Sequence, residues 1–202
     1  MFVEEVARNT KHCYQVTEYN RKRVMENTKI QQLLTQKFED KIYGFQEHFG
    51  VLKVYADKNI NLKLMQFLYD HEELAFRFLT DLTAVHYPKH KGGEIEVTYL
   101  MYNMYTNQSI RLNFAIDIKQ PDIFTATKLF EAANWLEREC YDFFGVNFIG
   151  HPNLIRIMNV EEMDYFPLRK EFPLEDQTRK DKDDEMFGRG NNFNYGSMNI
   201  KG

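Results

Sequence analysis

The sequence is poor in cysteine and has no long apolar run, and each absence excludes a class of protein. Among 202 residues there are only two cysteines, Cys13 and Cys140. They lie far apart in the sequence, so no disulfide framework is indicated and a reducing compartment is expected. No apolar stretch approaches the roughly 20 residues that cross a bilayer. The first residues include early acids and no apolar segment, which predicts no signal peptide. We therefore expect a soluble protein that a partner holds at a membrane, if it works there.

Motifs that bind nucleotides, dinucleotides and metals are also missing. There is no GxGxxG and no GxxxxGK[ST]. The six histidines occur without HExxH, CxxC or a cluster of acids that would complete a metal shell. They are interpreted as surface or loop residues. The net charge of -4 argues against a nucleic-acid-binding surface. The sequence therefore offers no self-contained chemistry.

The apolar pattern that is present predicts strands and helices. The chain is 43% hydrophobic, which is typical of a globular protein. In "EIEVTYLM" and "IRLNFAIDI" apolar and polar residues alternate, so each strand has one buried face. "IYGFQEHFGVLKVYAD" predicts a hairpin that turns at Gly50. The expected fold class is α+β (mixed α/β): a small antiparallel or mixed sheet with helices packed on it, followed by an extended C-terminal arm.

Three helices and four segments are expected along the chain. Helical spacing of apolar residues covers Thr28 to Phe38, Asn61 to Asp70 and about Phe124 to Phe144. Asn61 is a candidate N-cap and Gly145 a candidate C-cap. The segments are a poorly defined start (1–27), an α/β domain (28–145), an extended partner-binding arm (146–175) and a polar tail (176–202).

The stretch "ERECYDFF" is dense in charge and leaves two interpretations open. Glu137, Glu139 and Asp142 could serve acid–base catalysis, or they could belong to a charged helix face. Consecutive helical residues point about 100° apart, so Glu137 and Glu139 do not face one site together. Arg138 and Asp142 are four residues apart and can pair. The spacing favours the charged face, with Cys140 buried on the apolar stripe.

The arm is apolar and is interrupted by Pro152, Pro167 and Pro173. An extended segment with this many large apolar residues must lie against its own domain or against another subunit. The sequence thus predicts a contact surface.

The sequence "ERECYDFFGVNFIGHPNLIRI", followed by "FPLRKEFPLE", resembles the C-type subunit of the proton-pumping NADH:quinone oxidoreductase, respiratory complex I. This is the 30-kDa subunit family. The resemblance extends upstream through "FLTDLTAVHYP", "EIEVTYLMYNM", "IRLNFAID" and "AANWLERE", and covers roughly residues 74–175. It implies a structural subunit of the peripheral arm of the complex, whose C-terminal extension lies on the large D-type subunit. The implied signature and interface residues are Glu137, Arg138, Glu139, Asp142, His151, Pro152, Arg156, Pro167, Arg169, Lys170, Phe172 and Pro173.

The resemblance also implies where the cofactors and the membrane lie. This chain would bind no cofactor, and FMN and the iron–sulfur clusters would belong to partner subunits. The complex would be hetero-oligomeric, on the cytoplasmic face of the bacterial inner membrane. Two alternatives remain. The chain could be the equivalent subunit of a related membrane-bound hydrogenase or ferredoxin/quinone oxidoreductase. A remote alternative is a free-standing enzyme that uses Glu137, Glu139 or Asp142.

Overall fold

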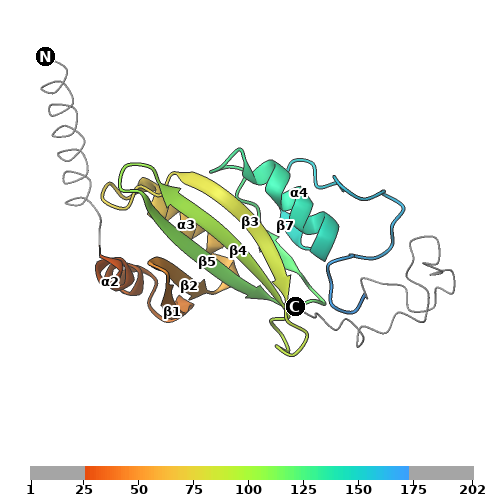
Figure 1. The fold of residues 1–202 in the computed structure, drawn as a ribbon, viewed down its shortest axis with the longest axis horizontal. Helices are drawn as coiled ribbons and strands as arrows, with labels where there is room; N and C mark the ends of the chain where they lie inside the picture. Colours follow the sequence, from red (N-terminus) through yellow and green to blue (C-terminus); the bar gives the residue numbers. More distant parts are fainter. Residues whose placement is uncertain (1–25, 173–202) are drawn as a thin grey trace, which may run out of the picture. The chain divides into compact units, whose positions relative to one another are not determined.

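The computed structural model describes residues 26–172, so the predicted N-terminal segment and polar tail lie almost entirely outside the described residues. Figure 1 shows the arrangement. The elements before the longest strands are α2 (Asn27–Phe38), η1 (Glu39–Lys41), β1 (Ile42–His48), β2 (Val51–Ala56), η2 (Lys58–Ile60) and α3 (Asn61–Asp70). The later elements are β3 (Phe78–His86), β4 (Ile95–Asn103), β5 (Gln108–Ile116), β6 (Asp122–Phe124), α4 (Ala133–Phe144) and β7 (Asn147–Ile149).

The main sheet is mixed, and the expected fold class is confirmed. Its strand order is β1-β2-β5-β4-β3, with β2 and β5 parallel and the other pairs antiparallel. The predicted hairpin joins β1 to β2, and Gly50 has a φ of 76° in the turn. A left-handed backbone of this kind favours glycine.

The core lies on the face of the sheet that the helices cover. Figure 1 shows α3 behind the sheet, and α4 packs against β3. The predicted alternation holds in β4, where Ile95, Val97, Tyr99 and Met101 are buried. The opposite face is polar. Asn113 of β5 lies on this polar face and is nevertheless buried, at 5% exposed.

The predicted helix from Phe124 to Phe144 is wrong in its first half. The first helical residue of α4 is Ala133, and Phe124 instead ends β6. Strand β6 pairs in parallel with β7, which follows α4 in the chain. Tertiary pairing therefore overrides the helical pattern before residue 133.

The two predicted helix caps have different outcomes. Gly145 ends α4 in a left-handed conformation with a φ of 73°, and its N–H donates to the Tyr141 carbonyl at 2.8 Å, which confirms the C-cap. Asn61 does not cap α3. Its side-chain amide donates to the Phe124 carbonyl at 2.6 Å, and so ties α3 to β6.

Candidate partner-binding site

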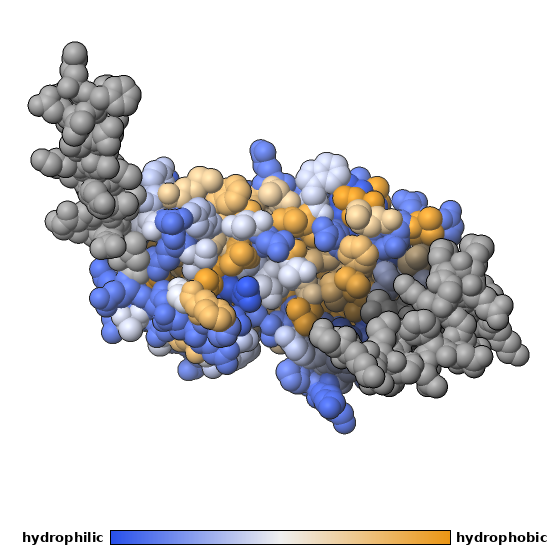
Figure 2. All heavy atoms as spheres, in the orientation of Figure 1, coloured by the Kyte–Doolittle hydropathy of each residue, from blue (hydrophilic) through white to orange (hydrophobic). Residues whose placement is uncertain are grey.

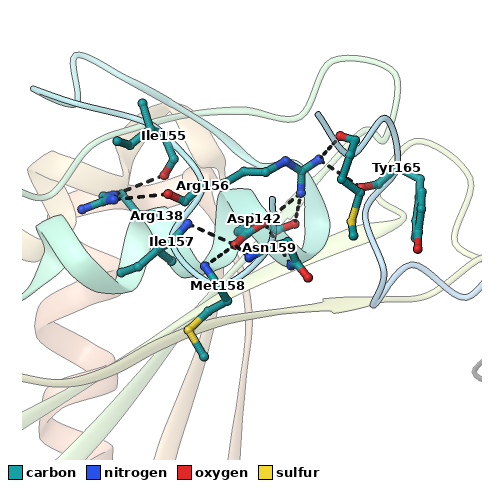
Figure 3. A network of polar contacts seen from close by, with 9 residues as sticks. Arg138, Asp142, Ile155, Arg156, Ile157, Met158, Asn159 and Tyr165 are labelled. Carbon is teal, nitrogen blue, oxygen red and sulfur yellow. Dashed lines mark hydrogen bonds and ion pairs between the residues drawn. The ribbon is translucent and has the colours of Figure 1, made fainter. Parts of the chain in front are cut away.

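The carboxylate of Asp142, on α4, is surrounded by donors from the arm (Figure 3). Its Oδ2 accepts the consecutive backbone N–H groups of Ile157, Met158 and Asn159 at 3.1, 2.7 and 2.9 Å. Its Oδ1 accepts from Arg156 Nη1 at 2.7 Å and from Asn159 Nδ2 at 3.0 Å. One buried anion thus fixes the backbone of residues 156–159. Three successive N–H groups converging on an oxygen form an anion-binding concavity.

Arg156 connects the end of α4 to a later part of the arm (Figure 3). Besides the Asp142 carboxylate, its guanidinium donates to the Asp142 carbonyl at 3.0 Å. It also donates to the carbonyls of Met163 and Tyr165 at 2.7 and 3.0 Å. Its planar fork therefore holds the end of α4 and residues 163–165 in one geometry, which a lysine could not reproduce.

The hydrogen bonds keep Asp142 ionised. Burial alone would raise the pKa of its carboxyl group. The N–H groups of Asn159 and Met158, together with Arg156 and the Asn159 side chain, lower that pKa far below its ordinary value. A carboxylate with several charge-stabilising donors behaves in this way. Asp142 is therefore an anion at neutral and mildly acidic pH, which suits it to hold the arm.

The predicted pair between Arg138 and Asp142 is wrong. Within residues 26–172, the ion pair of Asp142 is with Arg156. Arg138 instead donates to the carbonyls of Ile155 and Arg156, both at 3.2 Å, and its guanidinium lies 5.0 Å from the centre of the Trp135 ring. The network around Asp142 is already filled by arm donors, so Arg138 stabilises the arm by contacting its backbone.

Glu137 is buried and belongs to no charged face. Its carboxylate accepts from the Thr125 hydroxyl at 2.5 Å and from the Ala126 N–H at 2.6 Å. Burial raises its pKa to about 7, and the two hydrogen bonds partly oppose the rise. Glu137 thus holds the turn between β6 and α4. The charged-face interpretation is correct for Glu139, which is exposed.

The geometry keeps the three candidate acids apart. Glu137 faces the core, Glu139 faces solvent, and Asp142 faces the arm. Cys140 is buried, as predicted, and burial together with nearby acids raises the pKa of its thiol. Among the described residues, no group of three or more His, Cys, Asp and Glu side chains is arranged to hold a metal ion.

The remaining signature residues lie along the arm. His151 Nδ1 accepts from the Asn153 N–H at 3.0 Å, so its Nε2 donates to the Asn134 carbonyl at 3.1 Å. Arg169 donates to the Phe144 carbonyl at 2.7 Å. The Lys170 N–H donates to His86 Nδ1 at 3.0 Å. Of the others, Pro152 and Phe172 are exposed, Pro167 is half-buried, and Pro173 lies outside the described residues.

The arm therefore binds α4 through polar groups while several of its apolar side chains point to solvent. We call these side chains and the neighbouring tryptophan of α4 the outer apolar set: Trp135, Ile155, Ile157, Met158, Val160, Tyr165 and Leu168, each 37% to 70% exposed. Figure 2 shows hydrophobic residues among hydrophilic ones where α4 and the arm lie. Apolar side chains held outward on a fixed backbone are typical of a surface for another protein.

The solved structures that share this fold include the following two. One is described as "Nqo5 of the trypsin-resistant fragment (1-134)", with a TM-score of 0.55, 24% identity, and coverage of 64% of this chain and 100% of that one. The other is the membrane-bound sulfane sulfur reductase, described as an archaeal respiratory membrane complex. Its TM-score is 0.63 at 22% identity, with coverage of 79% and 98%. Both likenesses show the fold of this chain.

Sequence comparisons identify the family. The family model "Respiratory-chain NADH dehydrogenase, 30 Kd subunit" matches residues 54–178. The C-type subunit of NADH-quinone oxidoreductase from Citrifermentans bemidjiense is 33% identical over 155 residues, which are 77% of this chain and 94% of that protein. The protein of the same name from Parvibaculum lavamentivorans is 35% identical over 136 residues, 67% of each chain. The chain belongs to the 30-kDa subunit family of the respiratory-chain NADH dehydrogenase.

Proposed function

We propose that this chain is a non-catalytic structural subunit that docks onto the large D-type subunit of an NADH:quinone oxidoreductase through its arm. The observation that carries the proposal is that polar contacts fix the arm on α4 while apolar side chains remain exposed to solvent. Asp142 and Arg156 fix its backbone, and the outer apolar set points away from the domain. A rigid backbone reduces the ordering cost when a partner binds.

The proposal includes the rest of the complex. The chain supports electron transfer from NADH to quinone, coupled to proton translocation, by holding its neighbours in place. FMN and the iron–sulfur clusters belong to those neighbours, and this chain binds no cofactor. No helix in residues 26–172 has both the length and the apolar content to cross a membrane. In the proposed complex, partner subunits attach the chain to the cytoplasmic face of the bacterial inner membrane.

A mutational test separates docking from folding. Met158 and Val160 are 70% and 64% exposed, so aspartate at both sites should change the thermal stability of the chain little. Binding to the co-expressed D-type subunit should fall at least about tenfold. The matched control is Phe49→Asp, because Phe49 is an apolar residue that is 93% exposed in the β1–β2 turn. Unchanged binding by the double variant would refute the docking surface.

The two alternatives give different results in the purified complex. The related hydrogenase or ferredoxin/quinone oxidoreductase predicts a complex that lacks the flavin-containing NADH module, which mass spectrometry would detect. A free-standing enzyme predicts turnover by the isolated chain, and Glu137→Gln or Asp142→Asn would abolish that turnover. The relatives that match are named NADH-quinone oxidoreductase subunits, which supports the first proposal.

A further inference from the structure

The face of the sheet opposite the helices contains a hollow of about 490 Å³. Side chains from all five strands of the main sheet line it. Strand register places Lys53 of β2 beside Arg111 of β5, and Tyr55 of β2 beside Asn113 of β5. Gly44 of β1 lies beside Tyr55 and contributes no side chain. The hollow is separate from the arm and its contacts.

Two cations of the hollow, Lys53 and Arg111, are neighbours on adjacent strands. Among residues 26–172 the ion pairs are Lys29–Glu73 and Arg156–Asp142, so neither Lys53 nor Arg111 has a described carboxylate within 4.0 Å. Like charges on adjacent strands destabilise a sheet. In addition, Arg111 Nε is buried and has no hydrogen-bond partner among the described residues. A bound carboxylate would neutralise the pair and satisfy that donor.

The adjacent part of the hollow contains a hydrogen-bond acceptor that lacks a donor. The Asn113 amide Nδ2 donates to Glu96 Oε1 at 2.5 Å and to Thr98 Oγ1 at 3.3 Å. These two acceptors fix the orientation of the amide. Asn113 Oδ1 is left buried, without a partner among the described residues. A buried acceptor of this kind costs free energy until it receives a donor.

The charges of the hollow are balanced but separated. Lys53 and Arg111 lie on β2 and β5, whereas Glu96 lies on β4 and Asp81 lies on β3. A lone anion would be repelled by the two acids, and a lone cation by the two bases. A zwitterion satisfies both sides.

We propose that this hollow binds a small zwitterion of the α-amino-acid class. Its carboxylate lies between Lys53 and Arg111, and its ammonium donates to Asn113 Oδ1 on the side of Glu96. Leu100, which is opposite Arg111 in the sheet register, offers an apolar surface to the ligand's side chain. None of the residues that line the hollow belongs to the arm.

Titration of the full chain with L-leucine tests the proposal. Backbone amide resonances of Arg111 and Asn113 should shift and saturate, with a Kd of about 1 mM or tighter. 4-Methylpentanoate lacks the ammonium group and 3-methylbutylamine lacks the carboxylate, so each should bind at least about tenfold more weakly. No saturable shift at these amides would overturn the proposal. Equal affinity for either analogue would overturn it as well.

Variants of the two cations complete the test. Arg111→Met should weaken leucine binding at least about tenfold while the amide spectrum of the rest of the sheet is unchanged. Lys53→Met, at a half-buried position, should weaken leucine binding to the same extent. It serves as the test if Arg111→Met does not fold. Lys29→Met removes a cation that does not line the hollow and should bind leucine like the parent protein. Parent-like affinity in the folded Arg111 or Lys53 variant would overturn the site.

Discussion

Asp142 of α4 and Arg156 of the arm form an ion pair of 2.7 Å, and their side chains are 0% and 7% exposed. In Asp142→Asn, Arg156 loses its charged partner while three backbone N–H groups still converge on the position. Breaking a buried pair from one side typically costs about 3–5 kcal/mol. We expect a decrease of that size in the free energy of unfolding, and faster proteolytic cleavage within residues 154–166.

The double variant Asp142→Asn/Arg156→Met measures the interaction energy of the pair apart from the other contacts of each residue. Removing both charges leaves no unpaired ion. Arg156→Met should therefore lower the free energy of unfolding less in the Asp142→Asn background than in the parent protein. Urea unfolding of the four proteins measures this coupling. Additive effects, with the arm cleaved at the parental rate, would show that the pair does not hold the arm.

The buried Glu137 predicts a pH dependence of stability. Its folded-state pKa is raised from 4.5 to about 7. The folded protein therefore binds the proton more tightly than the unfolded chain does. The stabilising contribution is fully present below pH 4.5, decreases as the pH rises to about 7, and then stays constant. The total decrease is about 3 kcal/mol.

Glu137→Gln removes this titration while keeping the shape of the side chain. Its free energy of unfolding should lack the decrease between pH 5 and pH 8, so the variant should gain stability relative to the parent as the pH rises. Urea unfolding at the two pH values checks this. Glu139→Gln, at an exposed site, is the control. Parallel pH profiles for Glu137→Gln and the parent would contradict the prediction.

Arg138→Ala should affect the assembled complex more than its chemistry. The substitution removes the donors to the Ile155 and Arg156 carbonyls, and each lost hydrogen bond contributes about 1 kcal/mol. A less ordered arm should lower the amount of intact complex on native gels, with near-normal NADH:quinone turnover per remaining complex. Lys128→Ala, at an exposed site, is the control. Normal abundance with reduced turnover would instead place Arg138 in the mechanism.

Gly145→Ala should release the arm without removing a polar contact. A Cβ at this position would lie 2.5 Å from a ring atom of Phe166 and 2.6 Å from Arg169 Nη2, and the φ of 73° is itself unfavourable for alanine. The backbone alone costs about 1 kcal/mol. We expect increased protease sensitivity around residue 166 with an intact sheet, as measured by mass spectrometry of the fragments. Gly50→Ala, which has a similar φ and open space, controls for the backbone strain.

Local patterns in the sequence predicted most of the fold. The alternation in β4 and β5, the hairpin at Gly50 and the cap at Gly145 depend on residues that are neighbours in the chain. The start of α4 did not follow its pattern, because Phe124 belongs to a strand that pairs with residues after the helix. Pairings of that kind leave no periodic signal.

The candidate site was predictable in its location and not in its contacts. The density of charge from Glu137 to Asp142 falls where α4 makes its polar contacts with the arm. The four-residue spacing suggested Arg138 as the partner of Asp142, but Arg156, fourteen residues away, has that role. Likewise, the spacing showed that Glu137 and Glu139 diverge, and only packing decides which of them is buried.

The parallel pairing of β2 with β5 has a consequence for the order of folding. Strands β3, β4 and β5 are joined by short connections and can associate early, whereas β2 and β5 are separated by 51 residues, from Asp57 to Asn107. Closing so long a loop costs more entropy than closing a hairpin. The β1–β2 hairpin should therefore join the sheet late and open first. In hydrogen exchange, its amides should exchange through a lower-energy opening than those of β4.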